Sequence, residues 1–397
     1  MGLAHSPQVV TDGLVFYYDM GNPQKSWRGA PTTNLYADGD FSSNTLHPVR
    51  FGTWTIIDDP RNPAKKVLKA TPSASNQYHG RDITVVVSTV YSLQMEVFVS
   101  VDFNGTNVQM YPEQGGSGAS RSYDLNNKGT WQTLRFDGKA ATTTNIRMLA
   151  YILSAFTTGF VLISNVQVEQ NTFATPFVNS TRSNTQAIVD LTGNNTVTAT
   201  SLTYNSDGSF SFNGTNNEMY PPINHSYLSS SALEVIFRST SHGSGFKTII
   251  GYRHNSGFTL PTIGSLYLNS NNLSASVIAA SQVYRTATSS VSIATNTFYH
   301  VVLNKNTSSG LLEIYVNGVL TGSQTFDAAT FGQWTSAGQF IGANILDIGK
   351  STNTNSGQGW ATDFFNGIIP VAKVYNRVLT AAEVQQNFNA LRGRFGI

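Results

Sequence analysis

The chain of 397 residues contains no cysteine, and this absence excludes disulfides, thiolate metal sites and cysteine nucleophiles. Its stability must therefore come from packing or from contact with neighbouring subunits. Charged side chains are also scarce, at 12% of the sequence, which is roughly half of the share in an ordinary soluble protein. Asparagine, serine, threonine and glycine take their place, and these residues suit strands and tight hairpins better than helices.

The few charges do not gather into a stripe. The formal net charge is +2, and lysine and arginine occur singly, so no basic surface is expected to neutralise a row of phosphates. No apolar run reaches the length of a membrane span, and residues 1–10 have neither the basic nor the apolar region of a signal peptide. We therefore expect no nucleic-acid partner, no membrane association and synthesis in a cytoplasm.

What the sequence does contain indicates β-structure. Hydrophobic residues make up 40% and aromatic residues 11% of the chain, which is enough for substantial cores. Apolar side chains alternate with a period of two within residues 93–101, as in a half-buried strand. Similar strand patterns occur at residues 13–19 and in GTWQTLRFDG, GFVLISNVQVEQ, ALEVIFRS and FYHVVLNKN. Many short strands favour sandwiches over a parallel α/β sheet.

Two glycine-containing pairs predict tight turns between strands. Asp137-Gly138 follows the strand pattern of GTWQTLRF, and Asn317-Gly318 follows that of LLEIYV. Both pairs are typical of two-residue hairpin turns, because their residues tolerate positive φ angles. We therefore expect a hairpin at each position.

One helix is expected at the end of the chain. Thr380 and Glu383 match a capping box, and Gly393 stands where a C-terminal cap belongs. The apolar residues between them recur at i, i+4 and i+7, which predicts a narrow stripe that packs onto a sheet. This stripe consists of Val384, Phe388 and Leu391.

Several of these segments resemble a known family. The run FFNGIIPVAKVYNRVLTAAEVQQNFNALRGRFGI resembles the closing strand and terminal helix of concanavalin A-like (laminin-G-like) domains, which are common in structural proteins of tailed bacteriophages. FYHVVLNKN and LLEIYVNGVL resemble the family's central hairpin, and DLTGNNTVTAT with YNSDGSFSFNGTNN resembles its first strands. The resemblance covers most of residues 187–397 and implies a β-sandwich.

The region before it has a likeness of its own. NLYADGDFS, FGTW, KGTWQTLRF and VQVEQNTFATPFVNSTRS are similar to carbohydrate-binding-module-like jelly rolls of phage tail proteins. In the laminin-G-like family, a strand such as GLVFYYDMGN precedes the DLTGN segment by a short loop, whereas about 150 residues intervene here. An insertion after the first strand accounts for this gap, because insertions at exposed turns are tolerated.

We therefore predict an all-β protein made of two jelly-roll-like antiparallel β-sandwiches with one short C-terminal helix. Residues 1–31 form an N-terminal arm and the first strand of the laminin-G-like domain. Residues 32–182 form the inserted carbohydrate-binding-module-like jelly roll, and residues 183–397 form the main part of the concanavalin A-like domain. A tandem arrangement with an ordered N-terminal arm is the alternative.

The resemblance also raises the question of catalysis, because the concanavalin A-like fold includes glycoside hydrolases. Hydrolysis of a glycosidic bond requires two convergent carboxylates. Glu96, Glu234 and Glu313 instead stand alone on separate strands, and we expect each of them to point outward into solvent. The histidines show no metal-ligand spacing, and we expect His300 to be an ordinary packing residue. The sequence predicts no enzymatic activity.

Four tryptophans are candidates for packing or for ligand contact. Trp54 and Trp131 lie in strand patterns where the resembled module buries a tryptophan, and we assign both to packing. Trp334 and Trp360 lie in loops rich in glycine and serine. We regard these two as candidate ligand-binding residues that stack on sugars, with subunit contact as an equal alternative.

Calcium is the one cofactor that the resemblance implies, since laminin-G-like domains often bind it through aspartates and carbonyl groups. The candidate ligands are Asp19, Asp190, Asp347 and Asp363. Turn and cap roles explain single aspartates equally well, and no dense loop of oxygen ligands is present. No other cofactor is expected.

The leading functional hypothesis is a structural protein on the surface of a phage virion, as a capsid decoration, head fibre or tail appendage that also binds glycans. Such a protein would be made in the host cytoplasm and located at the virion surface. Its expected partners are other virion proteins and further copies of itself in a homo-oligomer. The alternatives are a dedicated carbohydrate-binding adhesin or tail-fibre receptor-binding protein, and then a polysaccharide depolymerase.

Overall fold

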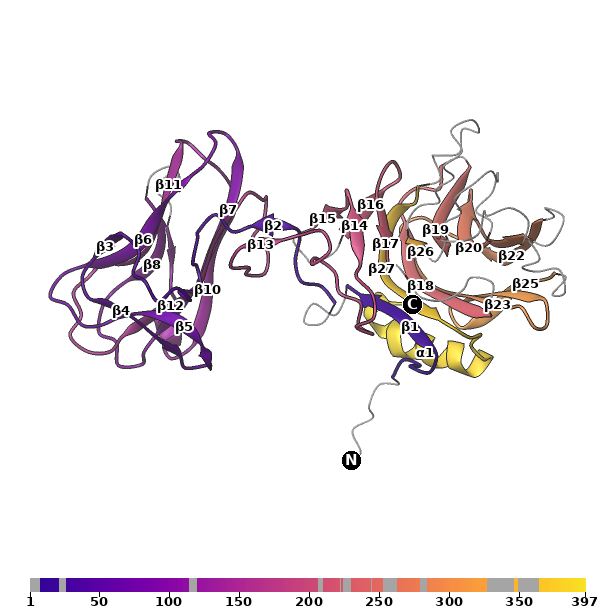
Figure 1. The fold of residues 1–397 in the computed structure, drawn as a ribbon, viewed down its shortest axis with the longest axis horizontal. Helices are drawn as coiled ribbons and strands as arrows, with labels where there is room; N and C mark the ends of the chain where they lie inside the picture. The colour runs from indigo at the N-terminus through magenta and orange to yellow at the C-terminus, as the bar shows by residue number, and fades with distance from the viewer. Residues whose placement is uncertain are drawn as a thin grey trace, which may run out of the picture. The chain divides into compact units, whose positions relative to one another are not determined.

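The computed structural model describes residues 8–20, 26–113, 120–205, 210–221, 223, 230–243, 245–252, 263–278, 284–326, 346–348 and 364–397. The chain divides into two compact units (Figure 1). Residues 30–183 form the first, which we name the central unit. Residues 1–29 and 184–397 together form the second, which we name the flanking unit because its two segments lie on either side of the central unit in the sequence.

The described part of the central unit contains two five-stranded antiparallel sheets and a short two-stranded ribbon. The first sheet has the order β10-β7-β12-β5-β4, with β4 at Trp54–Asp59, β5 at Asn62–Ala70, β7 at Val90–Val99, β10 at Trp131–Ala140 and β12 at Val161–Glu169. The second has the order β3-β6-β11-β8-β9, with β3 at Val49–Phe51, β6 at Gln77–Thr84, β8 at Val108–Pro112, β9 at Arg121–Ser122 and β11 at Asn145–Ile152. The ribbon pairs β2 (Thr32–Thr33) with β13 (Thr181–Arg182), and a single 3-10 turn spans Leu125–Asn127.

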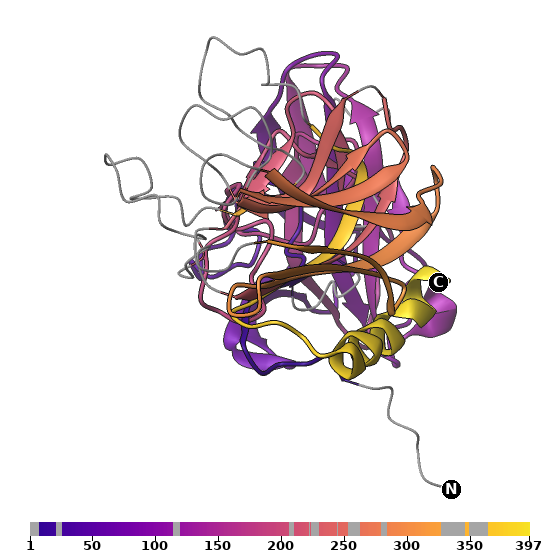
Figure 2. The ribbon, with the colours of Figure 1, turned by 90° about the vertical axis from the view of Figure 1, so that its right-hand side faces the viewer.

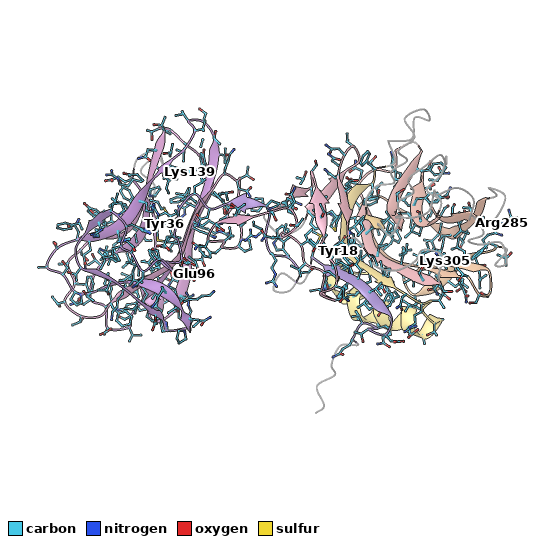
Figure 3. All side chains as sticks on the ribbon, viewed as in Figure 1. Tyr18, Tyr36, Glu96, Lys139, Arg285 and Lys305 are labelled. Atoms are coloured by element: carbon cyan, nitrogen blue, oxygen red, sulfur yellow. The ribbon has the colours of Figure 1, made fainter. Side chains whose placement is uncertain are left out.

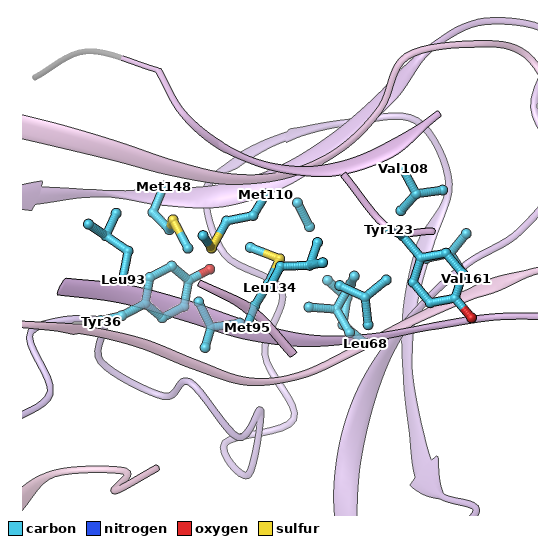
Figure 4. Packing of buried hydrophobic residues seen from close by; sticks show 14 of the residues in the cluster. Tyr36, Leu68, Leu93, Met95, Val108, Met110, Tyr123, Leu134, Met148 and Val161 are labelled. Carbon is cyan, nitrogen blue, oxygen red and sulfur yellow. The ribbon is translucent and has the colours of Figure 1, made fainter. Parts of the chain in front are cut away.

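The core of the central unit lies between its two sheets, where methionines join branched and aromatic side chains. Met95 and Leu134 from the first sheet belong to the same buried cluster as Met110 and Met148 from the second (Figure 4). The alternation expected at residues 93–101 is confirmed as far as Val99, because Leu93, Met95, Val97 and Val99 are all buried in this cluster. Val101 was expected on the same face, but β7 ends at Val99 and Val101 is 72% exposed. Methionine suits such a core because its flexible side chain fills irregular gaps.

The turn expected at Asp137-Gly138 is wrong. Both residues lie within β10, and the register with β7 shifts between Phe136 and Lys139. Gly138 has a φ of 62°, so the glycine accommodates a β-bulge rather than a hairpin. Asn317 and Gly318, by contrast, have φ angles of 49° and 84° between β24 and β25, which confirms the second predicted hairpin.

The described part of the flanking unit contains an eight-stranded and a seven-stranded antiparallel sheet. The eight-stranded sheet has β1 at Leu14–Asp19, β15 at Thr203–Tyr204, β16 at Phe210–Asn213, β18 at Ser231–Ser239, β23 at Phe298–Asn306, β24 at Leu311–Val316, β25 at Val319–Thr325 and β27 at Asn366–Tyr375. The seven-stranded sheet has β14 at Thr198–Thr200, β17 at Glu218–Tyr220, β19 at Phe246–Tyr252, β20 at Ile263–Asn269, β21 at Asn272–Ile278, β22 at Tyr284–Ser292 and β26 at Leu346–Ile348. With the C-terminal helix described below, these sheets bear out the predicted all-β class.

Strand β1 joins the two segments of the flanking unit. It pairs antiparallel with β27, so that Leu14 lies opposite Tyr375 and Asp19 opposite Val371. At the other end of this segment, Trp27 forms a β-bridge with Ile188. The two chain segments therefore lie side by side just before and just after residues 30–183.

Helix α1 (Ala381–Phe395) packs against the eight-stranded sheet (Figure 2). The predicted capping box is present, because the Thr380 side chain accepts a hydrogen bond from the Glu383 amide and the Glu383 side chain accepts one from the Thr380 amide. Gly393 is not the C-terminal cap. The helix continues past it to Phe395, and Gly396 ends it with a φ of 68°. No helix among the described residues has the length and apolarity that a bilayer span requires.

A charged cluster lies fully buried between α1 and the eight-stranded sheet. The Glu234 carboxylate on β18 accepts hydrogen bonds from Lys373 Nζ at 2.6 Å and His300 Nε2 at 3.0 Å through Oε1. Its Oε2 accepts one from Asn387 Nδ2 of α1 at 2.6 Å, and Asn387 Oδ1 accepts one from the Val10 amide at 2.7 Å. One carboxylate therefore connects two neighbouring strands, the helix and, through Asn387, the N-terminal segment.

The expectation that Glu234 points into solvent, and that His300 is an ordinary packing residue, is wrong. Leu233, Val235 and Phe237 alternate with Glu234 as expected, but helix α1 covers the other face of β18. Both Glu234 and its partner Lys373 have no exposed surface. Glu313 on β24 is half-buried. Glu96, which lies in the central unit (Figure 3), keeps 27% of its side-chain surface exposed.

Two opposing effects set the charge of Glu234. Burial raises its pKa, but the Lys373 ammonium and the His300 hydrogen bond outweigh burial and lower the pKa from 4.5 to about 2. Burial lowers the pKa of Lys373, and Glu234 offsets part of this effect. Because the unfolded chain binds the Glu234 proton more tightly, the stabilisation is complete above pH 4.5 and is lost as the pH falls towards 2.

Replacing Glu234 with Gln should lower the free energy of unfolding of the flanking unit by about 3–5 kcal/mol, because Lys373 would remain buried without a counter-charge. The matched control Glu313→Gln, on the half-buried carboxylate of the same sheet, should cost about 1 kcal/mol or less. Urea unfolding followed by tryptophan fluorescence measures both. A second change, Lys373→Met, should recover much of the loss in the Glu234→Gln background. Equal losses of unfolding free energy in Glu234→Gln and Glu313→Gln would contradict this role of Glu234.

Residues 30–183 should be removable from the chain. The Arg28 amide donates a hydrogen bond to the Ala187 carbonyl at 2.9 Å, so a short Gly/Ser loop can join the two cut ends. We expect the shortened protein to show a β-type circular dichroism spectrum and one cooperative melting transition. Deleting residues 1–19, which removes β1 and the Val10 contact, should abolish that transition in the same background, and retention of an unchanged melting temperature would support a tandem arrangement.

Candidate functional site

Four aromatic side chains form a continuous row across the second sheet of the central unit. Phe51 lies on β3, Tyr78 on β6, Tyr151 on β11 and Tyr111 on β8. The ring centroids of neighbours in this order are each 5.9 Å apart. We name this row the aromatic strip.

Strand alternation places the strip on the outer face of the sheet. On β11, Met148, Ala150 and Ile152 point into the core, so Tyr151 between them points outward. On β8, Val108 and Met110 are core residues, and Tyr111 follows on the opposite face. Phe51 is directly opposite Tyr78, which in turn is directly opposite Tyr151.

The strip is accessible and retains unused hydrogen-bonding groups. Phe51 is 49% exposed, and the three tyrosines are half-buried. Tyr151 Oη accepts a hydrogen bond from Asn76 Nδ2 at 2.9 Å, whereas the hydroxyl groups of Tyr78 and Tyr111 have no partner among the described residues. Neighbouring rings with free hydroxyls can offer both an apolar surface and polar contacts to a ligand.

The rings of the strip do not share one plane. Phe51 and Tyr78 are nearly parallel, at 29°, and the planes of Tyr151 and Tyr111 differ by 39°. Between these two pairs, Tyr78 and Tyr151 meet at 86°. A flat, rigid ligand can therefore lie on one pair only, whereas a flexible chain can follow both.

Paired charges lie on the same face beyond the strip. Arg147 on β11 donates to Asp82 Oδ1 at 2.7 Å and Oδ2 at 3.2 Å, and to Glu113 Oε2 at 3.1 Å. The hydrogen bond from Arg147 lowers the pKa of Asp82 below its ordinary value, and the same contact raises the pKa of Arg147. Asp82 and Arg147 are therefore both ionised near neutral pH.

A second aromatic row lies on the outer face of the first sheet. Phe98 on β7 lies 5.7 Å from Trp131 and 6.0 Å from Phe160, measured between ring centroids. The Arg61 guanidinium lies 3.7 Å from the Trp131 ring centroid and also bonds Glu96 at 2.7 Å. Trp54 is buried inside the core cluster, as expected. The expected burial of Trp131 is wrong, because its ring is half-buried on the outer face and lies outside that cluster.

Of the candidate ligand and calcium residues expected from the sequence, Asp19 and Asp190 have described side chains. Trp334, Trp360 and Asp363 lie outside the described residues, and only the backbone of Asp347, in β26, is described. They stay predictions.

The carboxylates of Asp19 and Asp190 both accept hydrogen bonds from other residues of the flanking unit. Asp19 accepts a two-point contact from Arg394 of α1 at 2.6 and 2.7 Å and a hydrogen bond from Tyr17 Oη at 3.0 Å. Asp190 accepts hydrogen bonds from the amides of Tyr17, Thr192 and Asn195 at 3.0 to 3.1 Å, which organise a turn. Among the described residues, no group of three potential metal ligands is present.

Comparison with known proteins found a family match within the flanking unit. Residues 221–385 match the sequence profile of the concanavalin A-like lectin/glucanases superfamily. The flanking unit contains a concanavalin A-like, laminin G-like domain. A comparison with curated protein sequences gave no match.

Solved structures similar to this chain include binding domains of botulinum neurotoxins. The serotype D/C binding domain has 17% identity and a TM-score of 0.39, over 52% of this chain and 50% of that chain. The DC binding domain in complex with SialylT has 17% identity and a TM-score of 0.40, over 52% and 49% of the two chains. The same domain in complex with rat synaptotagmin II has 15% identity, a TM-score of 0.38 and the same coverage. This chain thus spans about half the length of the structures it matches.

The aromatic strip was not expected from the sequence. Each of its residues is a single aromatic in its own strand, and up to 100 positions separate Phe51 from Tyr151 along the chain. The available signal is the outward position of each ring in an alternating strand, as in Val108, Met110 and then Tyr111. The cross-strand register that unites the four is a tertiary property.

Proposed function

We propose that the protein is a glycan-binding protein and that the aromatic strip of the central unit is its binding surface. The observation that carries this proposal is the alignment of Phe51, Tyr78, Tyr151 and Tyr111 across four strands at a constant spacing of 5.9 Å. Such a row offers successive contact points to a chain of similar units. The lectin-like fold of the flanking unit is compatible with the proposal, but fold alone does not define function.

The chemistry of the strip suits sugars. The C–H face of a pyranose ring packs on an aromatic face, while its hydroxyl groups need hydrogen-bond partners at the edges. Tyr78 and Tyr111 can donate and accept through their free hydroxyls, and the Asn76 amide lies beside Tyr151. The sheet holds the tyrosines, and Asn76 directly precedes β6, so little conformational entropy is lost when a ligand binds.

Replacing Tyr78 or Tyr151 with Ala should weaken glycan binding by about 1–3 kcal/mol, with aromatic stacking on other planar ligands as the guide. Tyr78→Phe should retain most of the affinity, because the ring remains. The matched control is Trp131→Ala, which removes a half-buried aromatic from the opposite sheet and should leave binding unchanged. Calorimetry with ligands chosen on a glycan array, alongside circular dichroism of each variant, tests this, and equal losses in Trp131→Ala would contradict it.

We further propose that binding occurs without hydrolysis. Glu96 is paired with Arg61, Glu234 is enclosed between helix and sheet, and Glu313 lies on a third strand, so these three carboxylates do not converge on one bond. Bound glycans should be recovered intact from the calorimetry cell.

The resemblance of residues 364–397 to phage structural proteins supports a location at the virion surface, which is a further part of the proposal. There the flanking unit would contact other virion proteins or further copies of this chain, and the central unit would carry the glycan surface. Quantitative mass spectrometry of purified particles should find this protein at a copy number fixed by particle symmetry. Its absence from particles, combined with glycan binding by the purified protein, would favour a separate adhesin.

A further inference from the structure

We propose that the aromatic strip selects uncharged glycan chains and discriminates against acidic ones such as polyuronates. This inference rests on the proposed glycan-binding function and names the class of ligand. It follows from the charged groups that share the outer face with the strip, and from the partners that these groups already have.

The charges on this face are mutually paired and leave an excess of negative charge. Arg147 is bonded to both Asp82 and Glu113, so one guanidinium faces two carboxylates. Among the described charged residues, the strand register places Arg147, Asp82 and Glu113 on the outer face together with the strip. Any carboxylate on a bound sugar would therefore meet a surface with a local charge of −1 and no cation that lacks a partner.

The negative charge of Glu113 lies close enough to Tyr111 to act on a ligand bound there. Glu113 comes two positions after Tyr111, and its amide continues the ladder by donating to the Arg147 carbonyl at 2.8 Å. Two residues of a strand span about 7 Å. This distance is shorter than the screening length of about 8 Å at physiological salt, so the Glu113 carboxylate repels an anion bound at Tyr111.

The opposite outer face shows the difference. There the Lys69 ammonium lies 4.8 Å from the Phe160 ring centroid, and it has no ion-pair partner among the described residues. An aromatic row with a cation at its end can accept an acidic ligand, because the cation compensates the loss of carboxylate hydration. The aromatic strip has no such group, so an acidic sugar would lose hydration there without compensation.

The experiment uses the full-length protein and pairs of oligosaccharides that differ only in oxidation at C6. Suitable pairs are β-1,4-gluco-oligosaccharides with β-1,4-oligoglucuronates, and manno-oligosaccharides with oligomannuronates, of equal length. Calorimetry at 150 mM salt gives the dissociation constants. We expect at least one neutral ligand to bind in a Tyr78-dependent way and its acidic counterpart to bind at least tenfold more weakly.

The double variant Asp82→Asn/Glu113→Gln removes both carboxylates and leaves Arg147 without them. We expect this variant to bind the acidic ligand several-fold more tightly and the neutral ligand with unchanged affinity. The matched control is Asp58→Asn/Glu96→Gln, which changes two carboxylates of the first sheet and should leave the ratio between neutral and acidic ligands as it is in the parent protein.

The outcomes separate the two proposals. Acidic ligands that bind as tightly as neutral ones, and lose that binding in Tyr78→Ala, would overturn the selectivity while the glycan site stands. Acidic binding that is insensitive to Tyr78→Ala but lost in Lys69→Ala would place an acidic site on the opposite face and leave the selectivity of the strip intact. Failure of every ligand to bind, or binding that no strip residue affects, would overturn both proposals.

Discussion

The buried carboxylate of Glu234 is the contact on which the flanking unit depends. A charge without exposed surface is tolerated only when cations and hydrogen-bond donors surround it, and here Lys373, His300 and Asn387 do so together. Because Asn387 belongs to the last helix and bonds the amide of Val10, the two ends of the chain are fixed at one point. The pairing of β1 with β27 extends this closure along the sheet.

A domain closed by its own termini can accommodate a second domain within its sequence. The chain leaves the flanking unit beside Trp27 and returns beside Ile188, which are paired in a β-bridge. The central unit closes in the same way, since β2 and β13 pair at its own two ends. Each unit thus has its own hydrogen-bonded boundary, and the aromatic strip is carried by regular sheets rather than by loops, which favours a preformed binding surface.

Local patterns predicted local structure well. The capping box of Thr380 and Glu383 and the Asn317-Gly318 turn depend on neighbouring residues, and both are confirmed. The alternation expected at 93–101 is confirmed as far as Val99, where the strand ends. The errors concern tertiary context. Glu234 alternates like a solvent-facing residue, but the outer face of its strand lies beneath α1. The strip was missed for the same reason, because sheet register, not sequence proximity, unites its four rings.

We propose that this protein contacts sugar through the outer face of the second sheet of the central unit. A crystal structure of the full-length protein with a bound neutral oligosaccharide tests it most directly. We expect sugar density across Tyr78 and Tyr151, with hydroxyl contacts to Asn76 and to the free hydroxyl groups of Tyr78 and Tyr111. Density confined to the flanking unit, or to the row around Trp131, with the strip unoccupied would contradict it.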